Sequence, residues 1–109
     1  MAGFTVGTDR VDCRLWANIN GTGTPAVRDD YNVSSIADRG TGLLTVTIDT
    51  DLGNNDYAVA GVCGNTGQDD RLICGKTPQT GGYFHIDTKN IANNFYDVDF
   101  AGVMVFGAE

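Results

Sequence analysis

The sequence is poor in the residues that favour exposed helices. Glu109 is its only Glu, and Lys76 and Lys89 are its only Lys. These residue types are strong helix formers at exposed positions, so their scarcity argues against a helical fold. The 15 Gly against 2 Pro favour tight turns between strands, because Gly adopts the positive φ that such turns require. The composition therefore predicts an all-β chain.

Positive charge is also scarce. The 7 basic and 14 acidic residues give a formal net charge of −7. A surface of this sign repels phosphate backbones, so we expect no nucleic-acid partner. No apolar run approaches the roughly 20 residues of a membrane span, which predicts no membrane insertion. The N-terminus has neither the basic nor the apolar segment of an export signal, so we expect synthesis in a cytoplasm without export.

Side chains suited to catalysis or metal binding are few. His85 is the only His, and it alternates with Phe84 and Ile86 as in a strand. No nucleophile motif surrounds it, and a metal site would need several His or Cys, so we interpret it as a sheet-face or interface histidine. The Asp-rich loop at 49–56 departs from an EF-hand loop, and solvated turn residues are favoured over an incidental calcium site. We therefore expect no enzyme, no catalytic residues, no metal and no cofactor.

The cysteines Cys13, Cys63 and Cys74 are an odd number, which excludes complete disulfide pairing within one chain. We interpret them as free, buried thiols. A bond between Cys63 and Cys74 stays open as an alternative, because spacing in the sequence does not establish the geometry of a disulfide.

A length of 109 residues suits one domain with one core. We expect residues 1–10 to form an N-terminal arm and residues 11–109 to form a single domain. A domain of this size buries a limited share of its surface, which favours an oligomer.

The hydrophobic pattern has a period of two. Between Val11 and Asn20 apolar and polar residues alternate, as in a half-buried strand. Further strands are predicted at 26–31, 33–36, 43–49, 57–63, 71–75, 83–87 and 97–107, with a turn at 37–42 and a helical turn or loop at 89–95. Turn signals every roughly 8 to 12 residues are typical of an antiparallel β-sandwich or jelly-roll-like fold with about seven or eight strands.

One strand differs from the others because the segment from Tyr57 to Cys63 is apolar on both alternating faces. This pattern predicts a central strand inside the sandwich. Replacing Val59 with Asp is then expected to destabilise the fold by several kcal/mol, since it would bury an unpaired charge.

Several large side chains fall at positions that the alternation predicts to be outside the core. Trp16 shares the polar face of its strand with Arg14, and together with Arg28 on the neighbouring strand it is a candidate interface residue. The alternative is a bulge that turns Trp16 into its own core. Tyr31 and Tyr83 are candidate glycan-binding residues, because aromatic faces stack on sugars.

Three motifs occur in a specific order: Trp-x-Asn-x-Asn-Gly-Thr-Gly-Thr at 16–24, Asn-Val-Ser-Ser-Ile at 32–36 and Asp-x-Gly-Thr-Gly at 38–42. Thr-Val-Thr-Ile at 45–48, Asn-x-x-Tyr-Ala-Val at 54–59 and Val-Met-Val-Phe-Gly at 103–107 follow them. With these motifs the chain resembles a module of tailed-bacteriophage virion proteins over most of its length, least between 64 and 96.

Such modules form outer parts of virions, commonly the C-terminal region of tail-fibre proteins. The resemblance implies a non-enzymatic, homotrimeric protein located in the virion. Since about ten residues precede Val11 and no stalk is present, we expect a capsid decoration protein that contacts the major capsid protein or a tail protein. The alternative is a tail-fibre tip or receptor-binding module that recognises a host surface glycan.

Overall fold

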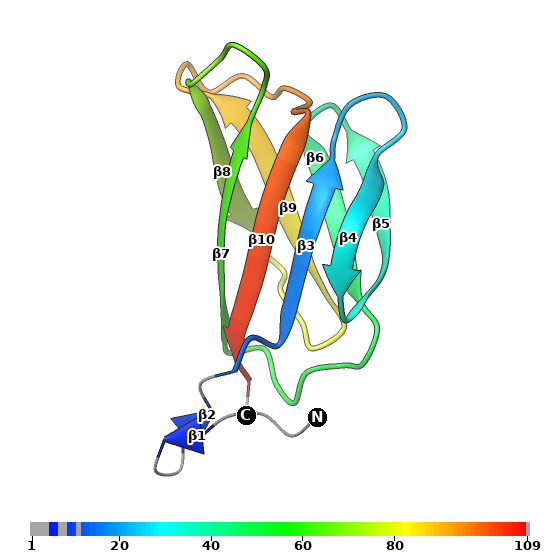
Figure 1. The fold of residues 1–109 in the computed structure, drawn as a ribbon, viewed down its shortest axis with the longest axis vertical. Helices are drawn as coiled ribbons and strands as arrows, with labels where there is room; N and C mark the ends of the chain where they lie inside the picture. The colour runs from blue at the N-terminus through cyan, green and yellow to red at the C-terminus, as the bar shows by residue number, and fades with distance from the viewer. Residues whose placement is uncertain (1–4, 7–8, 11, 109) are drawn as a thin grey trace.

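The computed structural model describes residues 5–6, 9–10 and 12–108, which contain ten strands and no helix. Two four-stranded antiparallel sheets pack face to face, with strand orders β4-β3-β10-β7 and β5-β6-β9-β8 (Figure 1). This architecture confirms the predicted all-β sandwich. The strands are β1 Thr5–Val6, β2 Asp9–Arg10, β3 Leu15–Asn20, β4 Ala26–Tyr31, β5 Val33–Gly40, β6 Leu43–Ile48, β7 Tyr57–Gly64, β8 Arg71–Lys76, β9 Tyr83–Asn90 and β10 Phe100–Gly107.

The core follows the period of two that the sequence predicted. On β3, Leu15, Ala17 and Ile19 are buried, while Trp16 and Asn18 between them are exposed. Burying a side chain such as Leu or Phe stabilises a fold by about 1.5–3 kcal/mol, so this inner layer accounts for much of the stability. The buried layer is completed by Leu44, Val46, Ile48, Leu52, Tyr57, Phe84, Ile86, Val98, Ala101, Val103, Val105 and Ala108.

Asn32 shapes the corner where the chain leaves one sheet and enters the other. It lies between β4 and β5 with a φ of 65°, a left-handed conformation that Asn tolerates better than most residues. Its side-chain amide donates to the carbonyl oxygens of Arg14 and Thr50, at 3.1 Å each, and its Oδ1 accepts from the Thr50 N–H at 2.7 Å. This one side chain therefore ties together the start of β3, the corner and the loop after β6.

The placement of β7 contradicts the sequence prediction. Tyr57 is buried, but the five residues from Ala58 to Val62 are exposed, and β7 is an edge strand rather than a central one. An uncharged strand has the same pattern whether both faces are covered or one face is open to solvent. Because 36% of the Val59 surface is exposed, the severe destabilisation predicted for Val59→Asp no longer follows.

Several boundaries also differ from the prediction, and β10 begins at Phe100 rather than at residue 97. β5 continues to Gly40 through the predicted turn, because it pairs with β6 across two register shifts. β9 extends to Asn90, and the segment that follows is a turn held by the Asn90 side chain, which accepts from the Ala92 and Asn94 N–H groups. β3 begins at Leu15, and Val11, where the predicted strand began, is outside the described residues.

The described part of the predicted N-terminal arm forms a short hairpin. β1 and β2 pair with each other, Thr5 opposite Arg10 and Val6 opposite Asp9, and belong to neither four-stranded sheet (Figure 1). Residues 1–4 and 7–8 of the arm are outside the described residues.

Candidate functional site: the outer face of the β4-β3-β10-β7 sheet

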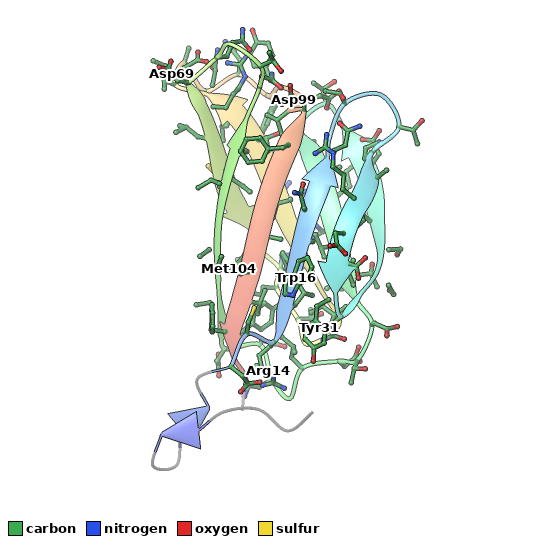
Figure 2. All side chains as sticks on the ribbon, viewed as in Figure 1. Arg14, Trp16, Tyr31, Asp69, Asp99 and Met104 are labelled. Carbon is green, nitrogen blue, oxygen red and sulfur yellow. The ribbon has the colours of Figure 1, made fainter. Side chains whose placement is uncertain are left out.

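A row of side chains crosses all four strands of one sheet on the face away from the core. Trp16 of β3 pairs in register with Tyr31 of β4 on one side and with Met104 of β10 on the other, and Met104 pairs with Ala60 of β7. Directly opposed residues of antiparallel strands point to the same face of a sheet. Figure 2 shows Trp16, Met104 and Tyr31 gathered on this side of the molecule.

We call the side of the β4-β3-β10-β7 sheet that faces away from the core the outer face. It exposes a large area of apolar side chains. The exposed fractions are 39% for Trp16, 46% for Met104, 54% for Tyr31 and 64% for Val62, with Phe100 and Phe106 at 40% each. Their combined exposed area is on the order of 500 Å². That is near the upper limit for the largest apolar patch of a typical monomer, and patches of this size are often functional.

A shallow groove runs along the middle of the outer face. Gly102 of β10 forms its floor, with Trp16 and Asn18 on one side and Ala60 and Val62 on the other. A Cβ built on Gly102 would meet no atom within 4 Å. The surface of the groove is therefore open above Gly102.

The outer face is also nearly free of charge. β10 and β7 contain no charged residue in 16 positions, in a chain that has 21 charged residues. On β4 the outer face includes one acidic residue, Asp29, which pairs with Asn18. A chain of net charge −7 thus has two adjacent strands, β10 and β7, at which contact opposes no carboxylate of the strands themselves.

The three candidate interface residues do not form one cluster. Trp16 lies on the outer face, on the side of its strand that the alternation predicted. Arg14 precedes β3, and its guanidinium donates to the carbonyl oxygens of Gly107 and Ala108 at 2.9 and 3.0 Å, which ties the start of β3 to the C-terminal end of β10. In Figure 2 Arg14 lies at the lower end of the sheet.

Arg28 is at the opposite end of the sheet. It is the extra residue of a β-bulge, because Asn18 pairs with Asp29 while Ile19 pairs with Val27. Its guanidinium donates to the Ile19 carbonyl at 3.2 Å and to the carbonyl of Asp99 before β10. Both arginines therefore bind backbone carbonyls at the ends of the sheet, and a contact of either with a partner stays a prediction.

The two candidate glycan-binding tyrosines lie on different sheets. Tyr31, at the end of β4, borders a polar hollow with Arg14, Asn32, Asp49 and Asp51. Tyr83, on β9, is half-buried beside His85, with ring centroids 5.5 Å apart. The structure does not bring them together as one platform.

His85 and the three cysteines are half-buried. The Nδ1 of His85 is 2.9 Å from the Thr45 hydroxyl, and burial, followed by the nearby Arg39, lowers its pKa. All three cysteines are free and half-buried, and burial raises the pKa of the Cys63 thiol, with a further contribution from Cys74. Within residues 12–108 no group of three or more His, Cys, Asp or Glu side chains converges as a metal site would require.

Sequence reasoning missed two features. The first is the breadth of the outer face, since Phe100, Met104 and Phe106 were assigned no role. A signal existed: β7 and β10 are apolar on both alternating faces, although a two-layer sandwich has one interior. The second is the ion pair between Arg39 and Asp87, which joins residues far apart in the sequence and leaves no local pattern.

Comparison of the chain with protein-family models, with curated proteins and with solved structures found no match. None of the described residues belongs to a helix that would cross a membrane. The similarity to phage virion modules therefore rests on the sequence motifs, and the role it implies stays a proposal.

Proposed function

We propose that this chain is a non-enzymatic structural protein of a tailed-bacteriophage virion, a homotrimeric knob that decorates the capsid and contacts the major capsid protein. The observation that carries the proposal is the outer face, on which Trp16 and Met104 are exposed beside a groove with no charged residue on β10 or β7. Large apolar patches of this kind are typical of protein contact sites. The motifs from Trp16 to Gly42 supply the virion context.

The distribution of charge supports an assembly role. A protein exposed on a particle benefits from a net charge away from zero, which keeps it soluble, and needs at least one surface that a neighbour can cover without desolvating charges. The net charge of −7 and the uncharged strands β7 and β10 provide these two properties in one small sandwich.

Electron microscopy of intact particles tests this proposal. Particles with the protein and particles from a deletion strain are compared, and the expected difference is a set of threefold knobs on the capsid. Difference density confined to the tail would overturn the capsid assignment. Absence of the chain from purified particles, measured by mass spectrometry, would overturn the virion role.

The second candidate is a tail-fibre tip or receptor-binding module that recognises a host surface glycan. The specific observation is Tyr31, which is 54% exposed and borders a hollow whose other side chains, among them Asn32, Asp49 and Asp51, carry hydrogen-bonding groups. A ring beside such groups suits a sugar, which stacks its apolar face and hydrogen-bonds at its hydroxyls.

A comparison of Tyr31→Ala with Tyr83→Ala tests the glycan candidate on an array of host surface glycans. The first substitution is expected to abolish binding, and the second to leave it unchanged because Tyr83 lies on the other sheet. The role is excluded if neither the wild type nor the variants bind any glycan and if particles that lack the protein adsorb normally.

A further inference from the structure

Each sandwich sheet has two edge strands, and three of the four edges carry features that block pairing with another chain. β4 has a bulge at Arg28 and the charges of Asp29 and Asp30. β5 has two register shifts and the charges of Asp38 and Arg39. β8 is a short strand of six residues with the exposed Lys76 at one end. Bulges and charges on edges are the common protection of soluble proteins against edge-to-edge association.

β7 is the exception. Its eight residues include no charge and no proline, and they pair with β10 in an unbroken register from Tyr57 opposite Gly107 to Gly64 opposite Phe100. No other described strand pairs with its second side, although the Gln79 side chain donates to the Tyr57 carbonyl at 2.8 Å at the start of the strand. A long, regular, uncharged edge with exposed side chains from Ala58 to Val62 is a template for one more strand.

We propose that β7 pairs antiparallel with β7 of a second copy of this chain, around a twofold axis that passes beside Ala60. In this register Ala60 lies opposite its own copy, Val59 opposite Gly61, and Ala58 opposite Val62. Each larger side chain thus meets a small one. Gly61 itself cannot be larger, because a Cβ there would lie 2.5 Å from the Gly102 carbonyl oxygen.

The face relationship also fits this register. A twofold axis perpendicular to the sheet requires paired residues that point to the same side, and Ala58, Ala60 and Val62 all belong to the outer face. Ala60 of one copy then adjoins Ala60 of the other. The row of Tyr31, Trp16, Met104 and Ala60 is thus followed by the same row of the second copy in reverse order. Two four-stranded sheets become one eight-stranded sheet with a continuous outer face.

Charge favours a second copy over a basic or acidic partner. Two copies that each carry −7 repel one another over most of their surface, and they approach with least repulsion where β7 and β10 contribute no charge. A basic partner would instead be attracted to the acidic loops, away from this edge. The pairing closes on itself, because it uses both β7 edges and leaves only the protected ones.

This inference is independent of the phage proposal and uses a different contact from the threefold one. Pairing through β7 alone gives two copies, and combined with a homotrimer it gives six. Light scattering coupled to size-exclusion chromatography measures the mass of the full chain directly. Wild-type protein with two or six copies supports the inference, whereas one or three copies overturns it.

A matched pair of variants locates the contact. Ala60→Lys places two like charges face to face at the axis, and we expect it to raise the dissociation constant of the pair more than about tenfold and so to halve the mass. Ala26→Lys makes the same change at an exposed position on the opposite edge of the same sheet and should leave the mass unchanged. An unchanged mass for Ala60→Lys, or an equal loss in both variants, overturns the inference.

Hydrogen exchange separates strand pairing from simple covering of the outer face. Covering the face leaves the edge amides of β7 open, but pairing hydrogen-bonds them to the second copy. Peptides from 57–64 should exchange more slowly in wild type than in Ala60→Lys, while peptides from 26–31 should be equal in both. Equal exchange at 57–64 in a wild-type protein that is associated would overturn the pairing of strands.

Discussion

Trp16 of β3 and Met104 of β10 lie directly opposite each other on the outer face, and 39% and 46% of their surfaces stay exposed although each is among the largest apolar side chains of its strand. Their neighbours along the strands, Ala17 and Val103, are buried in the core. The same two strands thus build the interior with one set of residues and present the other set to a partner.

This arrangement predicts that Trp16→Ala affects assembly and not folding. Truncation of a central aromatic in a contact typically costs about 2 kcal/mol or more of association energy, and here it removes no core side chain. We expect the thermal midpoint to stay within a few degrees and the mass in solution to fall threefold, measured by sedimentation. Leu72→Ala, at an apolar position 46% exposed on β8, is the control and should change neither. An unfolded Trp16→Ala protein would show that the indole supports its own core.

The exposure of β7 reduces the destabilisation expected from a charge at Val59. Since Val59 keeps 36% of its surface in solvent, we expect Val59→Asp to lower the free energy of unfolding by about 1 kcal/mol in dilute protein. Val46 on β6 has 0% exposure, and Val46→Asp should cost several kcal/mol or prevent folding, because it buries an unpaired charge. Chemical denaturation of the two variants measures the difference in the free energy of unfolding. A similar loss in both would indicate that β7 lies in the interior.

The contrast between β3 and β7 shows what the sequence alone predicts. On β3 the alternation of Leu15, Trp16, Ala17 and Asn18 distinguishes inside from outside, and that prediction is confirmed. On β7 every residue from Ala58 to Val62 is small or apolar, so hydrophobicity carries no information about which face is covered. The position of a strand in the sheet depends on long-range pairing, which local pattern does not encode.

The same limit applies to the polar contacts. Asp87 is 7% exposed and accepts from Arg39 of β5 at 2.9 Å, a contact that no local pattern in the sequence indicates. Gly40 was expected in a turn, yet it pairs with Leu43 and belongs to β5, as does Arg39 before it. Contacts between residues so distant in sequence require the register of β5, β6 and β9, and only the folded structure supplies it.

The ion pair between Arg39 and Asp87 predicts a clear loss of stability. The side chains are 23% and 9% exposed, and the Arg39 Nη2 also donates to the Leu44 carbonyl at 2.8 Å. Asp87→Ala leaves this guanidinium without its carboxylate, so we expect the free energy of unfolding to fall by about 3 kcal/mol. Asp30→Ala, at an exposed position on β4, should change it by less than about 0.5 kcal/mol.

A double variant tests the physical reason for that loss. Replacing both partners, as in Arg39→Met with Asp87→Leu, removes the charge that the single change leaves unpaired and should recover part of the stability. Equal unfolding energies for the single and double variants would contradict the explanation by an unpaired charge.

The hydrogen bonds of Asp99, in the loop before β10, predict that the stability of the fold depends on pH. The carboxylate of Asp99 accepts from the hydroxyl and the backbone N–H of Thr66 at 2.8 and 2.9 Å, and these hydrogen bonds hold its pKa below the usual 3.8. Because folding lowers this pKa, the stabilisation is present above the unfolded-state value and is lost as the pH falls through the folded-state value. Carbon NMR titration of the carboxyl groups should find Asp99 below 3.8, and Thr66→Val should raise its pKa by removing the hydroxyl donor. Thr41→Val, in the turn after β5, is the matched control and should leave the Asp99 titration unchanged; an equal shift in both variants would rule out the Thr66 hydroxyl as its cause.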